Sequence, residues 1–240
     1  SFIAEAPLQE AEADLFFFTK PDDLEYKIGL LVVDIFTKFV SVILLKDRKP
    51  STVLPAMEKA FKNIGGTPAV LFTDDGGEFS SNELKTFLEE HKIKHVITRS
   101  HAAVAERMVG TIKSMLYKRL KHTDETWFKI LYQVIFTLNY LRKSRSTGFT
   151  PKDAQDPKNY IKVKNNLEKH RLSSRTNPEI KIGDKVRLYK KRKNFQKQDV
   201  SIWSDRIYEV NEIEEVPKTM KLYHLNGVPK PVLRSEILLV

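Results

Sequence analysis

Long apolar runs dominate the start of the chain. Three segments rich in Phe, Val, Ile and Leu occupy residues 13–19, 26–36 and 38–46, and short turn or polar stretches separate them. Runs of this length and composition are typical of strands buried in a sheet. Because they follow one another so closely, the pattern predicts an antiparallel meander of three strands.

The spacing becomes helical after residue 49. Residues 50–65 form an amphipathic pattern, with Ser51 or Thr52 as a plausible N-cap and Gly65 and Gly66 as stop signals. This segment predicts a helix that packs one apolar face on the meander.

Strand and helix signals then alternate. A short buried strand is predicted at residues 69–75, a helix at 80–92 capped by Ser80 or Ser81, and another strand at 93–99. The order strand, helix, strand favours parallel pairing.

Two longer helical patterns follow, at residues 102–121 and 126–143. The second carries an apolar stripe that should cover the sheet, formed by Trp127, Leu131, Val134, Ile135 and Leu138. The fold class predicted for residues 1–155 is therefore α/β, a mixed sheet flanked by helices.

The last third of the chain reads as a separate unit. Residues 156–178 are polar and predict a linker that could hold one or two helical turns. Residues 179–240 contain short alternating segments divided by turn signals, including Asn226 before Gly227, and predict a small β-barrel.

Charge and composition narrow the class of partner. The net charge is +10 and the pI is about 9.5, which favours a polyanion such as nucleic acid, although a basic surface without a partner stays open. No cysteine occurs, so thiol catalysis, disulfides and Cys-ligated zinc are excluded. No apolar run approaches the roughly 20 residues of a membrane span and no signal-peptide pattern is visible, so we expect an intracellular, nuclear protein.

Three acidic residues carry the candidate chemistry. Asp14 lies among bulky apolar residues, where a carboxylate is costly unless it is paired or metal-bound; it could instead be a strand-edge residue that points to solvent. Asp74 ends a buried strand before Gly76 and Gly77, which permit a sharp turn, but an ordinary acidic turn has the same composition.

Glu106 falls on a helical stripe with Gly110, Lys113 and Tyr117, opposite the apolar side, although a solvated helix face would look similar. Converging carboxylates repel one another unless a divalent cation holds them. Together with the basic charge, the three acids predict a metal-dependent enzyme that acts on nucleic acid.

Five blocks in order resemble a known family. "ADLFFF", "VVDIFTKFV", "FTDDGGEF", "VAERMVGTIK" and "STGFTP" are similar to the retroviral-type integrase core, most closely that of Polinton/Maverick elements. The resemblance implies an RNase H-like fold with a catalytic triad of Asp14, Asp74 and Glu106 that binds two Mg²⁺ or Mn²⁺ ions. Lys113 matches a family position that contacts the element's DNA end, and "IKIGDKVRLYKKRKNFQK" resembles the SH3-like or chromo-like C-terminal domain.

The sequence departs from the family pattern at several points. Asp34 is a family-typical acid outside the triad, and we predict a structural or supporting role for it. The interval from Asp74 to Glu106 is several residues short, with the shortfall between Ser100 and Glu106. The zinc-binding N-terminal domain of relatives is not found in this sequence.

Basic residues concentrate in three stretches and predict contacts with the DNA backbone, although a solvated face is the alternative for the last of them. The DNA-binding candidates are Lys113, Lys118, Arg119, Lys185, Arg187, Lys190, Lys191, Arg192 and Lys193. A further group comprises Arg142, Lys143 and Arg145.

The predicted function is a DNA integrase of a mobile element or virus, performing 3′-end processing and strand transfer of element DNA into double-stranded target DNA. Chemistry on two ends of one element implies a homo-oligomer. Two alternatives stay open: a domesticated, non-catalytic DNA- or chromatin-binding protein, and an RNase H-like nuclease that only hydrolyses.

Overall fold

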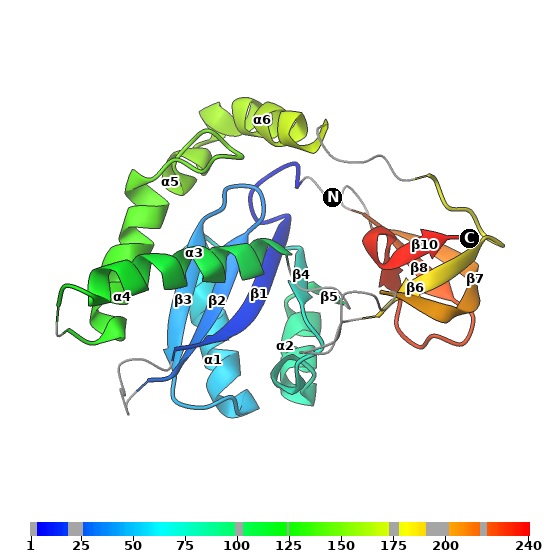
Figure 1. Ribbon diagram of the computed structural model, residues 1–240, viewed down its shortest axis with the longest axis horizontal. Helices are drawn as coiled ribbons and strands as arrows, with labels where there is room; N and C mark the ends of the chain where they lie inside the picture. Colours follow the sequence, from blue (N-terminus) through cyan, green and yellow to red (C-terminus); the bar gives the residue numbers. More distant parts are fainter. Residues whose placement is uncertain are drawn as a thin grey trace.

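The computed structural model contains two β-sheets, a larger one flanked by helices and a smaller one formed by the C-terminal residues (Figure 1). The structure describes residues 4–18, 26–98, 103–123, 125–172, 178–190, 202–216 and 220–240. Within these residues, no helix is long and apolar enough to cross a membrane.

The larger sheet has the strand order β3-β2-β1-β4-β5. The strands β1 (Glu10–Phe17), β2 (Ile28–Asp34) and β3 (Val40–Leu45) form the predicted antiparallel meander. The strands β4 (Val70–Thr73) and β5 (Lys94–Ile97) add to β1 in parallel, which confirms a mixed sheet.

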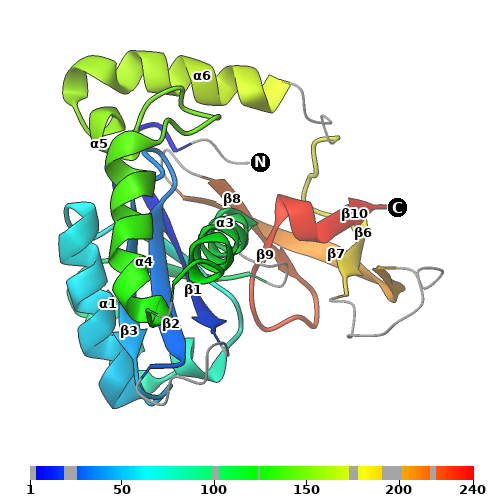
Figure 2. The same cartoon turned by 60° about the vertical axis from the view of Figure 1, so that its left-hand side comes forward.

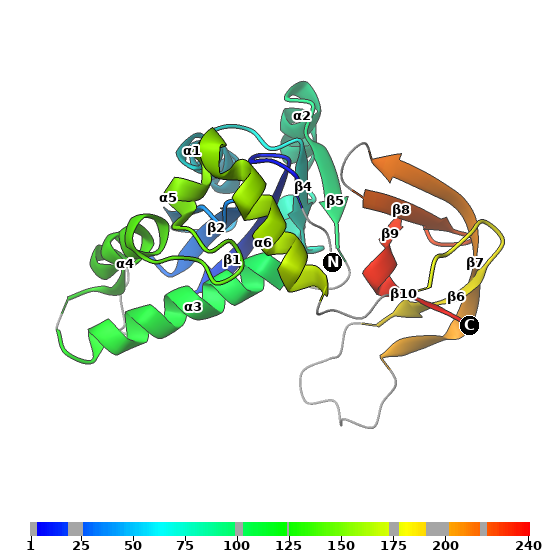
Figure 3. The ribbon, with the colours of Figure 1, turned by 90° about the horizontal axis from the view of Figure 1, so that it is seen from above.

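Two helices cover one face of this sheet (Figure 3). The N-cap of the helix α1 (Pro50–Ile64) is Lys49, two residues before the earlier of the two predicted caps, so the assignment to Ser51 or Thr52 was wrong. Pro50 explains the difference, because its fixed φ suits the first helical position. Gly65 ends the helix with φ 113°, as predicted.

The helix α2 (Asn82–Glu90) follows a short 3₁₀ turn, η1 (Gly77–Phe79). Ser81 is its N-cap and accepts a hydrogen bond from the Leu84 N–H at 3.2 Å, which confirms one of the two predicted caps. The apolar side of α2 packs with α1 through Phe61 and Phe87, whose rings are 6.4 Å apart.

The helices α3 (Ala103–Leu120) and α4 (Trp127–Phe136) cover the opposite face, and α4 continues into a π-helical segment, η2 (Thr137–Leu141). Trp127 is fully buried and stacks on Phe18 with centroids 5.1 Å apart. The predicted apolar stripe of α4 does pack on the sheet. On α3 the buried positions are Ala105, Val109, Ile112 and Leu116.

The predicted linker contains a helix of 13 residues, α6 (Tyr160–Leu172), which lies with α5 (Pro151–Ala154) across one end of the sheet (Figure 2). A 3₁₀ turn, η3 (Pro157–Asn159), joins the two. Val163 and Leu167 are buried in one cluster with Phe36, so α6 packs on the larger domain.

The smaller sheet is antiparallel throughout, in the order β10-β6-β7-β8-β9. Its elements are β6 (Lys185–Tyr189), β7 (Trp203–Val216), β8 (Met220–Leu225), β9 (Val232–Leu233), the turn η4 (Arg234–Glu236) and β10 (Ile237–Leu239). Among the described residues no pairing joins β9 to β10, so closure into the predicted barrel stays a prediction.

The smaller sheet packs beside β5. Lys94 of β5 forms an ion pair with Glu214 of β7. Val216 and Leu222 share an apolar cluster with Val96 of β5. The two domains are therefore joined by apolar and charged contacts.

Candidate catalytic site

Asp14 and Asp74 lie at the same level of neighbouring strands. The parallel pairing sets Glu12 of β1 opposite Phe72 of β4. Asp14 and Asp74 each come two residues later, and both side chains are half-buried. Side chains alternate across a strand, so Asp14 and Glu12 share the face that α3 covers.

The turn after β4 holds the Asp74 carboxylate in place. Asp74 Oδ1 accepts a hydrogen bond from the Gly76 N–H at 3.1 Å. A Cβ at Gly76 would lie 3.0 Å from this oxygen and 2.9 Å from Cδ of Glu78, so a larger residue here would have to displace one of these two carboxyl groups. Glu78 thus brings a second carboxyl group to the turn, which the sequence did not single out as a site residue.

Glu12 fastens the start of α3 to β1. Its Oε2 accepts hydrogen bonds from the backbone N–H groups of Val104 and Ala105, each at 2.7 Å. These N–H groups belong to the first turn of the helix, where no intrahelical acceptor exists. Glu106 is the next residue and is exposed. The role of Glu12 as the acceptor for these N–H groups can be recognised only from the tertiary structure.

The structure therefore brings two of the three predicted acids to adjacent strands and ties the third to the same strand through Glu12. In the described part of the chain, however, no group of three or more His, Cys, Asp or Glu side chains is arranged to hold a metal ion. A metal site formed by Asp14, Asp74 and Glu106 stays a prediction.

A buried group of charges, which no local pattern in the sequence indicates, lies next to this region. Glu10 is 0% exposed, and neither of its carboxylate oxygens has a hydrogen-bond partner among the described residues. Burial, with repulsion from Glu12, raises the pKa of Glu10 from 4.5 to about 7. Lys38 offsets part of this repulsion, and burial lowers its pKa.

Asp34 closes the turn between β2 and β3. Its Oδ1 accepts from the Leu8 N–H at 2.9 Å and its Oδ2 from the Thr37 N–H at 2.8 Å and the Thr37 hydroxyl. Burial raises the pKa of Asp34, and the two hydrogen bonds from Thr37 oppose that shift. The structural role predicted for Asp34 is confirmed.

Charged and polar groups also surround the outer side of the Asp74 turn. Asp75 forms an ion pair with Lys230 of the smaller domain at 2.7 Å. His95 Nε2 lies 2.9 Å from the Thr73 hydroxyl, and burial, together with Lys230 and Lys85, lowers the pKa of His95 to about 4. His95 is therefore neutral near pH 7, which suits the structural role of a strand histidine.

The predicted DNA-binding residues fall into three groups. Lys118 and Lys185 are exposed, and Lys190 is exposed with its Nζ 2.7 Å from Asp205. Three others are engaged within the fold: Lys113 lies over the Phe16 ring, Arg119 donates to Gln133 and Thr137, and Arg187 donates to the carbonyl of Ser204. Lys191, Arg192 and Lys193 lie outside the described residues.

The chain is similar in sequence to known integrase-related proteins. Residues 4–103 match the integrase core domain family (rve). An uncharacterized transposon-derived protein of Caenorhabditis elegans is 26% identical over 222 residues, which cover 87% of this chain and 72% of that protein. The retrovirus-related Pol polyprotein from transposon 297 of Drosophila melanogaster is 28% identical over 131 residues, 53% of this chain but only 12% of the polyprotein.

Solved integrases have a similar fold. The HTLV-2 integrase catalytic core domain in complex with magnesium, in its trimeric form, is 26% identical with a TM-score of 0.53, over 63% of this chain and 98% of that one. The simian T-cell lymphotropic virus intasome is 17% identical with a TM-score of 0.56 over 98% of this chain and 82% of that one, which shows a likeness of fold alone. The larger domain therefore has the RNase H-like fold that the resemblance implied, and the findings together support an integrase core of the kind found in transposons and retroviruses.

Proposed function

We propose that the chain is the integrase of a mobile element related to Polintons, and that it processes and joins element ends to nuclear target DNA. The observation that carries the proposal is the placement of Asp14 on β1 and of Asp74 directly after the neighbouring strand β4, each two residues beyond the Glu12–Phe72 pair and within the residues that match the integrase core. The attachment of α3 to β1 through Glu12 supports a place for Glu106 beside them.

The donor set suits a hard divalent cation. Asp14, Asp74 and Glu106 supply only carboxylate oxygens, which Mg²⁺ and Mn²⁺ prefer. The HTLV-2 integrase core was solved in complex with magnesium. We propose that these three residues hold two such ions, which, when bound, lower the pKa of an attacking water or hydroxyl and stabilise the leaving oxygen.

The protein's own contribution is to position the DNA. The phosphate backbone would follow the exposed stripe of α3 that contains Glu106, Gly110 and Tyr117. Gly110 has no neighbouring atom within 4 Å of an added Cβ, so this stretch of the stripe is open. The exposed Lys118 and Lys185 would neutralise phosphates without reading the base sequence.

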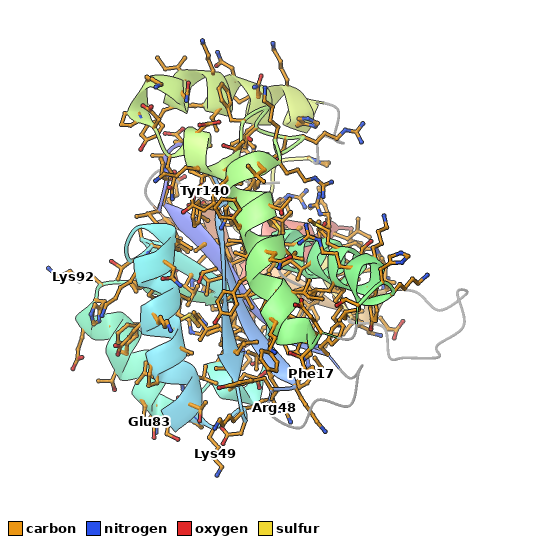
Figure 4. All side chains as sticks on the ribbon, turned by 90° about the vertical axis from the view of Figure 1, so that its left-hand side faces the viewer. Phe17, Arg48, Lys49, Glu83, Lys92 and Tyr140 are labelled. Carbon is orange, nitrogen blue, oxygen red and sulfur yellow. The ribbon has the colours of Figure 1, made fainter. Side chains whose placement is uncertain are left out.

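We further propose that the active form is a homo-oligomer. Aromatic side chains recur every fourth residue along α4 and η2, where Tyr132 is 70%, Phe136 54% and Tyr140 44% exposed. Tyr140 is labelled in Figure 4. Such an apolar stripe suits a second copy of the chain. Sedimentation velocity showing only monomer at micromolar concentration, with and without DNA, would rule this out.

The central test is an Asp74→Asn variant with Asp75→Asn as its matched control. Asp75 is the neighbouring acid and is engaged by Lys230. We expect Asp74→Asn to abolish Mg²⁺-dependent joining of a pre-cleaved terminal-repeat oligonucleotide and to leave DNA binding within about twofold, whereas Asp75→Asn keeps joining activity. Full joining by Asp74→Asn would refute the assignment.

One observation favours a second candidate function. Within the described residues, no three acids are grouped closely enough to hold a metal ion. This arrangement is compatible with a domesticated, non-catalytic DNA-binding protein, which needs no metal site. The same joining assay discriminates the candidates: an integrase joins the DNA ends, an RNase H-like nuclease only hydrolyses, and a non-catalytic protein binds DNA without either reaction.

A further inference from the structure

A pocket of about 290 Å³ lies on the side of α3 away from the Glu106 stripe. It is bounded by the start of α3, the turn between β2 and β3, and the segment that follows η2. The lining residues are Lys38, Val104, Arg107, Met108, Thr111, Leu138, Arg142, Lys143, Ser144, Arg145, Ser146 and Pro151.

The charges of this pocket are one-sided, because its lining contains five cationic side chains and no carboxylate. Lys38 faces the buried acids behind it, chiefly Glu12 and Asp34. The other four cations make no ion pair with any described residue. Glu12 also attracts Arg107, so the buried acids offset part of the charge of Lys38 and Arg107. Arg142, Lys143 and Arg145 repel one another around the hollow, and an anion that enters would reduce this repulsion.

The rim of the pocket is held rigidly by hydrogen bonds. The Ser144 N–H donates to the Phe149 carbonyl and the Gly148 N–H to the Ser144 carbonyl, both at 2.8 Å. From α6, Asn166 Nδ2 donates to the Thr147 carbonyl at 2.7 Å. His170 Nε2 lies 2.8 Å from the Arg145 carbonyl. A rim ordered before binding reduces the entropy lost when a ligand enters.

The remaining walls are apolar and come from Val104, Met108, Leu138 and Pro151. A hollow that combines apolar walls with guanidinium groups suits a ligand with a flat, weakly polar ring and a phosphate. The hydroxyl of Thr111 donates to the Arg107 carbonyl at 3.0 Å. The Ser144 and Ser146 hydroxyls also line the pocket and lie 3.2 Å apart, so one donates to the other and the second has its hydrogen available for a phosphate oxygen.

We propose that this pocket binds one nucleotide, with the phosphate on Arg107, Arg142 and Arg145 and the base against Met108 and Leu138. Arg107 follows Glu106 directly, and the two side chains diverge by about 100° around the helix. A DNA strand that crosses the start of α3 could therefore place one nucleotide in the pocket and a neighbouring phosphate near Glu106. The inference that the nucleotide belongs to a DNA strand rests on the proposed function. The inference that the pocket binds a nucleotide does not.

The test is calorimetric titration of the full chain with dAMP, deoxyadenosine and inorganic phosphate in EDTA, where no metal-dependent reaction occurs. We expect dAMP to bind at least tenfold more tightly than either fragment. The variants Arg142→Glu and Arg107→Ala should each weaken dAMP binding at least tenfold. Lys92→Glu is the matched charge reversal on the far side of the domain and should leave it unchanged (Figure 4).

Each outcome separates the possibilities. A single-stranded oligonucleotide that competes with dAMP assigns the pocket to DNA; dAMP binding without competition assigns it to free nucleotide. Phosphate binding as tight as dAMP, or equal losses in Lys92→Glu and Arg142→Glu, would overturn the nucleotide site. Circular dichroism confirms that each variant is folded, and dAMP binding by Asp74→Asn shows the site to be independent of catalysis.

Discussion

Glu12 shows how one side chain can set the position of a whole helix. Its carboxylate meets two N–H groups at the positive end of the α3 dipole, where a negative charge is favourable. Burial raises its pKa, and the hydrogen bonds from Ala105 and Val104 oppose that shift. Glu12 therefore contributes to the site by placing the turn that carries Glu106.

Replacing Glu12 tests this positioning role. Glu12→Ala leaves two helix N–H groups without an acceptor, and we expect a loss of about 1–3 kcal/mol in unfolding free energy. Glu12→Gln keeps an oxygen that can accept both bonds and should retain most of the stability. Urea unfolding and the joining assay measure the two effects; we expect joining to fall in Glu12→Ala and to recover in Glu12→Gln. Equal behaviour of the two variants in both assays would contradict the role.

Glu10 predicts a pH dependence of stability. Its pKa is about 7 in the folded chain against 4.5 ordinarily, so between these values the native state holds a proton that the unfolded state has released. Stability contributed by this group is therefore present below pH 4.5 and is lost as the pH rises to 7, by about 3 kcal/mol at most.

A Glu10→Gln variant cannot ionise and should not show this loss. We expect the variant to gain stability relative to the unmodified chain between pH 5 and pH 8, as measured by urea unfolding at both values. A difference between the two proteins that is independent of pH would show that Glu10 titrates normally.

Elements whose periodicity was clear were predicted well from the sequence, and the others were not. The meander and α1, α2, α3 and α4 have strong apolar periods, and each of them formed. The segment of α6 predicts only a linker with one or two helical turns, because Val163 and Leu167, four residues apart, are the buried residues among its positions 160–170. Two apolar contacts in a polar segment produce no period from which a helix can be recognised.

One tertiary contact anchors the π-helical segment η2. Asn139 is 2% exposed, its Oδ1 accepts from the Val40 N–H at 3.0 Å, and its Nδ2 donates to the Val40 carbonyl at 2.8 Å. This pair joins the end of the α4 segment to β3.

An Asn139→Leu substitution should leave both backbone groups of Val40 without a partner. We expect a loss of about 2–5 kcal/mol in unfolding free energy, because each unsatisfied buried group costs about 1–3 kcal/mol. Asn139→Asp keeps the acceptor and should lose less. Urea unfolding measures both, and equal stability of Asn139→Leu and the unmodified chain would contradict the contact.

At the scale of the molecule, apolar contacts should hold the two domains together more strongly than their ion pairs do. Two ion pairs join the domains, Glu214 with Lys94 and Lys230 with Asp75. The side chains of these pairs are 33–63% exposed, a range in which an ion pair contributes about 0–1 kcal/mol. Leu222 of β8 is buried in the cluster that includes residues of β4, β5 and α6.

Small-angle X-ray scattering can separate the two contributions. We expect the double variant Glu214→Ala, Lys230→Ala to keep the radius of gyration of the unmodified chain, whereas Leu222→Asp places a charge in the shared cluster and increases it. The control is circular dichroism, which should still show the strands of the smaller sheet. An unchanged radius of gyration in Leu222→Asp would show that the cluster around Leu222 does not hold the two domains together.

The sequence by itself determined the order of strands and helices, the three candidate acids and the basic character of the chain. These follow from local chemistry: alternation and helical period report which side of an element is buried, and charge reports the class of partner. The hydrogen bonds between Glu12 and α3, the raised pKa of Glu10, the docking of α6 and the basic pocket were decided only by the tertiary structure. Each joins residues far apart along the chain, 92 positions for Glu12 and Val104, and no local pattern records what a buried face is buried against.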